Sequence, residues 1–171
     1  MLSVGALILL ACLLVFFVVD SSAQQTSSAL AIRYAEQVIG DLRSLEARVA
    51  DAESGQRGYL LTGDPGYLVP YDVAPAASTQ LLAQLNEALS SPLGDNAELE
   101  RLSSTGALVR SKLAELRHAV ELQQNGKAAE ALALVRSNTG LAVMDRLRAD
   151  IAMIATSEGH WLDHWLDGRR R

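Results

Sequence analysis

The chain has 171 residues, of which 49% are hydrophobic and 5% aromatic. This length fits one globular domain plus one membrane segment, and the predominance of Ala and Leu favours helix over sheet. A net charge of −5 argues against a nucleic-acid-binding surface. The single cysteine, Cys12, excludes a disulfide framework and a thiolate metal site. Stability must therefore come from helix packing.

The first element is an apolar run over residues 4–19, and the first ionised residue is Asp20. With the residues before it, the run just reaches the roughly 17–20 residues that span a bilayer. We expect an uncleaved membrane anchor over residues 1–20. Two alternatives remain open. One is a cleaved signal peptide processed at the small residues 21–23, and the other is a lipoprotein whose processing box is residues 9–12.

A long helix is predicted from about Ser28 to Leu61, because apolar residues recur there in steps of three and four. Gly40 is a weak point that costs roughly 1 kcal/mol relative to alanine. The helix should end where the glycines and the proline of residues 63–66 force a turn. Its seam comprises Ala35, Val38, Leu42, Leu45, Val49, Ala52, Gln56 and Tyr59.

Two further helices follow the turn. The second is predicted from about Tyr67 to Leu89, with Pro70 and Pro75 near its start or in an irregular first turn. After a loop, Asp95 and Glu98 form a capping-box-like start of the third helix, which stops at Asn125-Gly126. Their apolar faces are Tyr71, Ala74, Ser78, Leu81, Leu85 and Ala88, and then Leu99, Leu102, Gly106, Val109, Leu113, Leu116 and Val120.

A short helical piece from Lys127 to about Arg136 precedes a break at residues 137–140 and a last helix. Four amphipathic helices joined by short loops are best satisfied by an antiparallel four-helix bundle. The predicted fold class is therefore all-α, an antiparallel four-helix bundle following one N-terminal transmembrane helix. The first helix should start, and the last should end, on the membrane side. The last seam comprises Met144, Leu147, Ile151, Ile154, Glu158, Trp161 and Trp165.

A long motif around the predicted turn reads DAESGQRGYLLTGD at residues 51–64. It resembles the signature of the CHASE family, third class; the acronym stands for cyclases/histidine kinases associated sensory extracellular domain. The similarity covers roughly residues 30–166, which is nearly all of the chain after the apolar run. Further matching pieces are Tyr67-Leu68, Pro70-Tyr71, Lys112 to Leu116, Met144 to Arg148 and Glu158.

The resemblance implies an extracytoplasmic sensory bundle that serves a histidine kinase or cyclase. Residues 1–20 would be the anchor or signal segment, residues 21–167 the bundle, and residues 168–171 a basic tail. The sequence holds no second membrane helix, kinase histidine box, nucleotide-binding glycine loop or cyclase motif. We therefore expect a module without its own output domain: an accessory protein, a degenerate paralogue or a fragment of a longer receptor.

The expected location is the inner membrane, with a single pass and the bundle on the periplasmic or extracellular side. This orientation follows from the resemblance, because no Lys or Arg precedes the apolar run. The expected partners are the lipid bilayer and either a second copy of the chain or a signalling protein. No cofactor and no nucleic acid are expected, and the ligand is not indicated.

Candidate functional residues gather in the motif. Glu53 and Arg57 lie four apart on one helix face, with the acid before the base. They form either an exposed pair worth roughly 0.3–0.5 kcal/mol or, with Gln56, a buried polar network that fixes helix register. Ligand contact is a further alternative. The candidate network residues are Glu53, Gln56, Arg57, Tyr59, Thr62, Asp64, Tyr67, Tyr71 and Glu158; for the tyrosines we expect packing roles.

The last helix offers a second function class. Glu158 stands on the core seam, where an unpaired carboxylate is costly, and we expect it to meet an Arg or Gln or to be partly solvated. His160 and His164 have a spacing that can hold a metal, but no third strong ligand is near in sequence. A metal-binding or hydrolytic envelope protein using these three residues is the alternative to a non-catalytic sensor. Trp161 and Trp165 instead indicate a helix end at a membrane surface.

Overall fold

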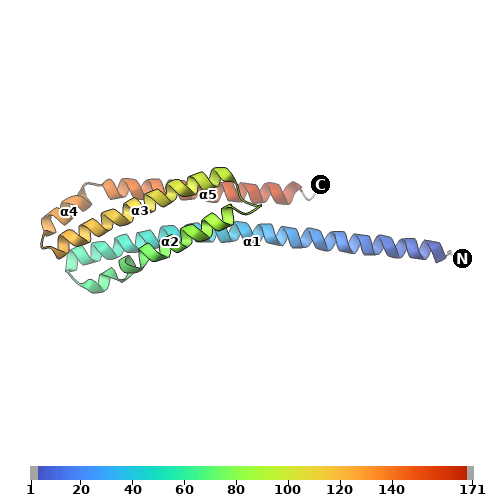
Figure 1. The fold of residues 1–171 in the computed structure, drawn as a ribbon, viewed down its shortest axis with the longest axis horizontal. Helices are drawn as coiled ribbons and strands as arrows, with labels where there is room; N and C mark the ends of the chain where they lie inside the picture. The colour runs from blue at the N-terminus through green and yellow to red at the C-terminus, as the bar shows by residue number, and fades with distance from the viewer. Residues whose placement is uncertain (1–3, 169–171) are drawn as a thin grey trace.

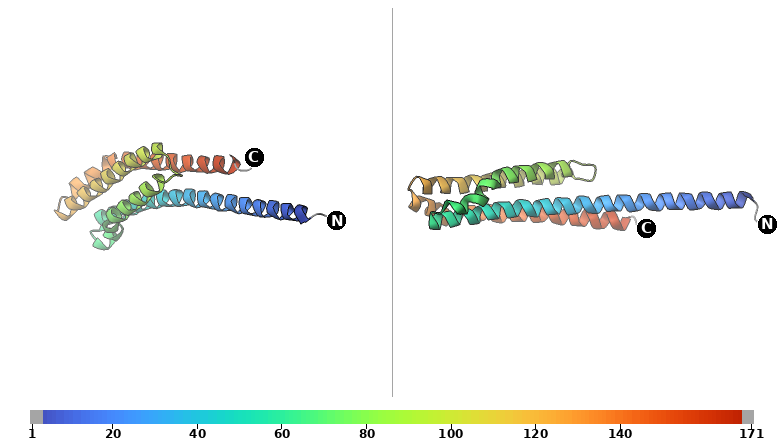
Figure 2. Two further views of the ribbon diagram at one scale, coloured as in Figure 1. Left: turned by 45° about the vertical axis from the view of Figure 1, so that its right-hand side comes forward. Right: turned by 90° about the horizontal axis from the view of Figure 1, so that it is seen from below.

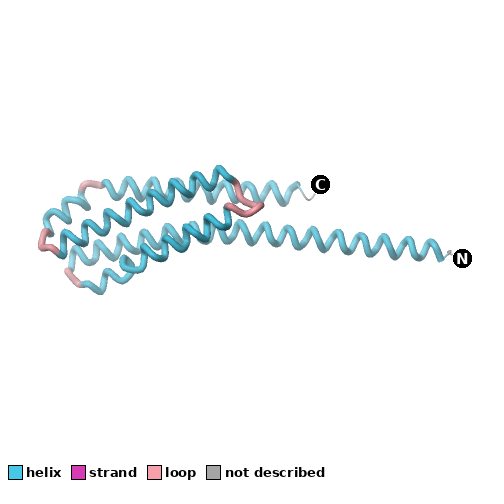
Figure 3. The backbone as a smooth tube through the Cα atoms, viewed as in Figure 1, coloured by secondary structure: helices cyan, strands magenta, loops and turns pink. Residues whose placement is uncertain are grey.

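The computed structural model describes the backbone of residues 4–168, and the side chains of residues 12–14 and 27–168. This part of the chain is helical and contains no strand, so the all-α class is confirmed. Helices α1, α2, α3 and α5 lie side by side, and consecutive ones run in opposite directions (Figures 1 and 3). The elements are α1 (Val4–Thr62), the 3₁₀ helix η1 (Pro65–Leu68), α2 (Val69–Leu89), α3 (Asn96–Gln124), α4 (Ala128–Arg136) and α5 (Thr139–Gly168).

The core lies between the four long helices, and each contributes its predicted apolar stripe. The α1 seam is buried from Ala35 to Gln56, but at its end Tyr59 is half-buried and Leu60 is buried in its place. A strict 3.5-residue pattern drifts against the 3.6-residue turn of a straight helix. The buried face therefore moves over by one residue near the turn, and Leu60 packs with Ala119 and Ala131 in a small second cluster.

The predicted anchor and the predicted first helix form one continuous helix. We expected a helix from about Ser28, whereas α1 begins at Val4, and its N-terminal part continues beyond the other helices (Figures 1 and 2). Both ends of the described chain lie toward the same end of the molecule. In the described residues, no helix is sufficiently long and apolar to cross a membrane. Most side chains of the proposed anchor lie outside the described residues, as does the tail beyond Gly168.

The second helix differs from its prediction at its start. Residues 65–68 form the 3₁₀ helix η1, and the α-helix begins at Val69 and not at Tyr67. Pro70 is in the first turn, where a missing N–H costs nothing, but Pro75 lies inside α2. A proline there removes one hydrogen bond of the helix, which leaves the Tyr71 carbonyl without its usual donor.

The capping and stop residues predicted for α3 lie at its two ends, with one correction. The Asp95 side chain caps α3 by accepting a 3.0 Å hydrogen bond from the Ala97 N–H. Glu98 does not complete a capping box in the way we expected; it is buried, and its Oε2 lies 3.6 Å from Arg101 Nε. Gly126 adopts a φ of +75° after the end of α3, which is the conformation that favours glycine at a helix stop.

Candidate functional site

The motif forms a hairpin from the end of α1 to the start of α2. The Thr62 hydroxyl donates to the Gly58 carbonyl at 2.8 Å and accepts from the Asp64 N–H at 3.1 Å. Asp64 Oδ1 in turn accepts from the Gly66 N–H at 2.8 Å and so caps η1. Thr62 and Asp64 are thus turn-forming residues that hold η1 against α1.

The glycines of the motif allow η1 to approach α1 closely. A Cβ atom on Gly55 would collide with the backbone carbonyl oxygen of Tyr67, and one on Gly58 would collide with the Tyr67 ring. Tyr67 is therefore laid across the glycine face of α1 while remaining about half exposed. Tyr71, one turn further on, is half-buried at the edge of the core.

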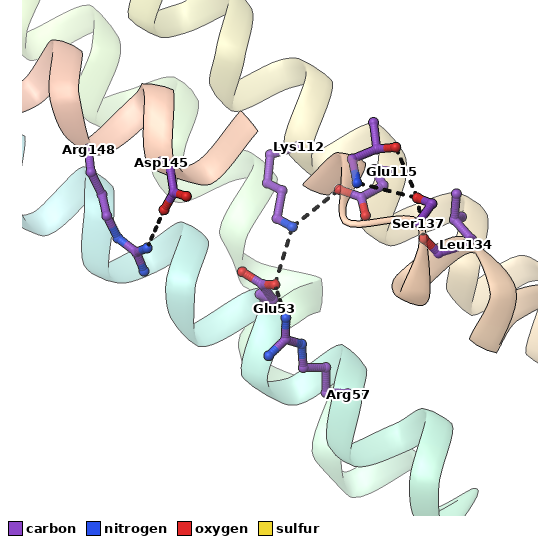
Figure 4. A network of polar contacts seen from close by, with 9 residues as sticks. Glu53, Arg57, Lys112, Glu115, Leu134, Ser137, Asp145 and Arg148 are labelled. Atoms are coloured by element: carbon purple, nitrogen blue, oxygen red, sulfur yellow. Dashed lines mark hydrogen bonds and ion pairs between the residues drawn. The ribbon is translucent and has the colours of Figure 1, made fainter. Parts of the chain in front are cut away.

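A buried lysine joins this hairpin to the opposite side of the bundle. Lys112 on α3 has 1% of its surface exposed, and its Nζ lies 3.3 Å from Glu53 Oε1 and 3.2 Å from Glu115 Oε2 (Figure 4). Glu53 also pairs with Arg57 Nη2 at 2.7 Å. The four side chains alternate in charge and sum to zero, so each carboxylate faces a cation and the buried ammonium is compensated.

The network also fixes the junction of α4 and α5. A Cβ atom on Gly140, in the first turn of α5, would collide with the Glu115 carboxylate, so a glycine is needed for Glu115 to lie there. Asn138, with φ of +59°, forms the break just before this point. A polar cavity of about 50 Å³ lies beside the network, lined among others by Gln56, Lys112 and Asn138. That space is enough for water.

The structure unites part of the predicted site and adds residues to it. The pair of Glu53 and Arg57 is present, and Gln56 is buried beside it. Lys112, the centre of the network, was not among the predicted network residues. In the sequence its segment carries only the family resemblance, because a lone lysine after Arg110 and Ser111 has the pattern of an exposed helix position. Its two carboxylate neighbours become visible only when α1 and α3 are packed.

Arg57 is more exposed than a buried network would require. About 55% of its side chain is in solvent, although its contact with Glu53 is short. We expect Arg57→Ala to lower the free energy of unfolding by about 0.5 kcal/mol, since exposed i,i+4 pairs are worth little. Arg169→Ala, in the tail outside the described residues, serves as the comparison. Urea unfolding measures both variants. Equal and negligible changes in the free energy of unfolding for Arg57→Ala and Arg169→Ala would contradict this expectation.

A second polar cluster lies near the other end of the bundle. Glu158 on α5 is buried and accepts a 3.3 Å hydrogen bond from the Tyr34 hydroxyl on α1. The Trp161 ring meets the Tyr34 ring edge-on at 5.4 Å between centroids, and Trp165 stacks on Trp161 at 5.5 Å. Our expectation of an Arg or Gln partner for Glu158 is wrong, because its hydrogen-bonding partner is a tyrosine. Trp161 is part of the edge of the core.

Glu158 should make stability depend on pH. Burial raises the pKa of its carboxyl above the ordinary 4.5, the Tyr34 hydrogen bond lowers it, and the negative charges of Glu98 and Asp95 raise it again; the net shift is upward. A raised folded-state pKa means that the stabilisation is full below the unfolded-state pKa and is lost as pH rises through the folded one. The contribution of Glu158 to stability should therefore fall as pH rises from about 4.5.

Glu158→Gln tests this dependence, since glutamine keeps an acceptor for Tyr34 but cannot ionise. We expect the variant to be more stable than the parent at neutral pH and to lose the decline above about pH 4.5. Glu100→Gln, at an exposed position on α3, is the matched control. Urea unfolding between roughly pH 4 and pH 8 measures both; an unchanged slope in Glu158→Gln would contradict the assignment.

The histidines of the predicted alternative do not form a metal site with their neighbours. His160 and His164 are exposed on α5. Across the described residues, no group of three or more His, Cys, Asp or Glu side chains is placed to hold a metal ion.

Comparison with known proteins gives one finding. Residues 29–164 match the family model described as CHASE3 domain, which covers most of the chain and every element from the motif to α5. Searches of curated proteins and of solved structures give no significant match.

Proposed function

The chain belongs to the CHASE3 domain family, whose members are sensory extracellular domains of signal-transduction proteins, and we propose that it is a membrane-anchored sensory module acting through a signalling partner. The stimulus is received by the bundle outside the cytoplasm, and the partner is a histidine kinase or cyclase. The module itself is not a catalyst. It associates with a second copy or directly with the partner protein.

The observation that carries this proposal is the course of α1. One helix runs from Val4 to Thr62, and its far end carries Glu53, which pairs with Lys112 on α3. A change in the packing of the polar network therefore acts on the same rigid element that leads to the N-terminus. Arg148 on α5 adds a second link, because its Nε lies 3.3 Å from Glu46 Oε1 on α1. Through these two ion pairs, a displacement of α3 or α5 would shift α1 as well.

Anchoring in the inner membrane is supported by the uncharged residues 4–19. Fusions of alkaline phosphatase and of green fluorescent protein to the C-terminus test the location in a bacterial host. We expect an active phosphatase and dark fluorescent protein in the membrane fraction. A soluble, fluorescent fusion would contradict the proposed location.

A chimeric receptor tests the sensory role. Residues 21–168 replace the sensory domain of a histidine kinase whose output is read by a reporter gene. We expect Lys112→Met to change the reporter level, because it breaks the contact between α1 and α3. Lys127→Met, in an exposed pair with Glu130, is the control. If both folded, membrane-inserted chimeras gave the parental output, the polar network would have no role in signalling.

A further inference from the structure

A groove runs between α2 and α3. Its volume is about 820 Å³, which lies within the range of small-molecule sites. Its floor is apolar, because Val109 and Leu113 of α3 are buried core residues. The lining residues are Tyr71, Asp72, Pro75, Ser78, Thr79, Leu82, Val109, Arg110, Leu113, Ala114 and Arg117.

Several of the residues that line the groove have short side chains. Pro75, Ser78 and Thr79 of α2 and Ala114 of α3 line the space between the helices, and their side chains are too short to fill it. Thr79 directs its hydroxyl back to the Pro75 carbonyl at 2.8 Å. The opening therefore follows from the sequence of α2 and does not require a movement of the bundle.

Ser78 contributes a buried hydroxyl to the lining of the groove. The residue has 1% of its surface exposed, and its Oγ is buried without a hydrogen-bonding partner in the described part of the chain. A buried hydroxyl without a partner costs about 1–3 kcal/mol. A serine within a helix can donate to the carbonyl one turn before it, but Ser78 does not.

Two arginines determine the charge that the groove prefers. Arg110 and Arg117 of α3 are seven residues apart, so they lie roughly 10 Å apart along one helix face. Both are exposed, and neither forms an ion pair or hydrogen bond with another described residue. Asp72 is the lining carboxylate. The lining residues therefore carry one net positive charge on a chain whose net charge is −5, and they favour an anion over a cation. Glu121, which acts electrostatically on Tyr71, is a nearby carboxylate outside the lining.

We propose that this groove binds a small amphipathic carboxylate. The carboxylate pairs with a guanidinium of Arg110 or Arg117, since arginine binds carboxylates with two parallel hydrogen bonds. The apolar body lies over Val109 and Leu113. A neutral apolar ligand would leave the arginines unused, and a cation would be repelled. As the stimulus of the bundle, this ligand class rests on the proposed sensory function, but its binding can be measured without signalling.

The probe for this site is 5-phenylpentanoate, titrated into the full chain in a mild non-ionic detergent. Calorimetry should give saturable binding, and the primary amide of the same acid should bind about tenfold more weakly or worse, the equivalent of losing one charge-assisted hydrogen bond. The double variant Arg110→Gln/Arg117→Gln should lose a similar factor. Absence of saturable binding, or equal binding of acid and amide, would overturn the proposal.

Two tryptophan variants locate the bound probe. Ala114→Trp fills the groove and should abolish binding, whereas Ala107→Trp, exposed on the same helix outside the groove, should leave it unchanged. Equal binding by both would place the probe elsewhere and overturn the proposal. A second contradictory result is a parent that does not bind the carboxylate and forms a dimer in sedimentation, with Ala114→Trp losing that dimer. The groove would then be covered by a second copy of the chain. A parent that binds the acid in a chimera without signal output would contradict the sensory function only.

Discussion

Replacing Lys112 with alanine should lower the free energy of unfolding by about 3 kcal/mol, the largest effect expected for a single polar side chain here. The ammonium is buried and lies within ion-pair distance of Glu53 and Glu115. Without it, two partly buried carboxylates face each other across α1 and α3 with only the exposed Arg57 to compensate them. Removing one partner of a buried pair costs more than the pair itself contributes, because the remaining charge stays desolvated.

The second lysine of the chain is the matched control for this experiment. Lys127 lies 3.5 Å from Glu130, and both side chains are more than half exposed. Lys127→Ala should therefore change the unfolding free energy by at most about 0.5 kcal/mol. Urea unfolding of both variants decides the matter. A Lys112→Ala protein as stable as Lys127→Ala would mean that the contacts of Lys112 do not contribute to holding α3 against α1.

Substituting Gly55 with alanine should lower the free energy of unfolding by about 2 kcal/mol. The new methyl group would collide with the Tyr67 carbonyl, which is backbone and cannot rotate away. The 3₁₀ helix η1 would have to move off α1, and the start of α2 would move with it. This loss outweighs the gain of up to about 1 kcal/mol that alanine brings to a helix interior.

Gly40 makes the sign of this effect testable within the same helix. A Cβ atom there would meet nothing within 4 Å. Gly40→Ala should therefore raise the unfolding free energy by roughly 0.5–1 kcal/mol, from helix propensity alone. In both thermal and urea unfolding, Gly40→Ala should be more stable than the parent and Gly55→Ala should be less stable. If Gly55→Ala were also stabilising, the close approach of η1 to α1 would be wrong.

The helices were largely predictable because their stripes follow one local rule. The spacing of apolar residues from Ala35 to Ala52 gave the buried face of α1, and Gly126 gave the end of α3. The starts were harder. The shift from Tyr67 to Val69 depends on a 3₁₀ turn set by Asp64 and Pro65, and periodicity does not register such a turn. Pro75 was likewise predicted near the start of the helix, because proline is disfavoured in a helix interior. The spacing of apolar residues does not show that α2 accommodates a proline there.

The candidate site was predictable only where its contacts are local. Glu53 and Arg57 lie on one helix, and their spacing of four residues predicted the ion pair that they form. Lys112 and Gly140 come together with Glu53 and Glu115 only through tertiary packing. The burial of Glu158 followed from its seam position, but its partner Tyr34 lies on another helix and could not be named. The exposed arginines of the α2–α3 groove carry no sequence signal at all.

The unbroken length of α1 has a consequence for rotation. Its 59 residues extend for about 88 Å, and every residue turns the backbone by about 100° around the axis. The azimuth of the N-terminal end relative to the bundle is therefore set by the number of residues between them. One residue inserted after Gln25 would advance that end by only about 1.5 Å but swing it by about 100°. Seven inserted residues would return it to within about 20° of its original direction.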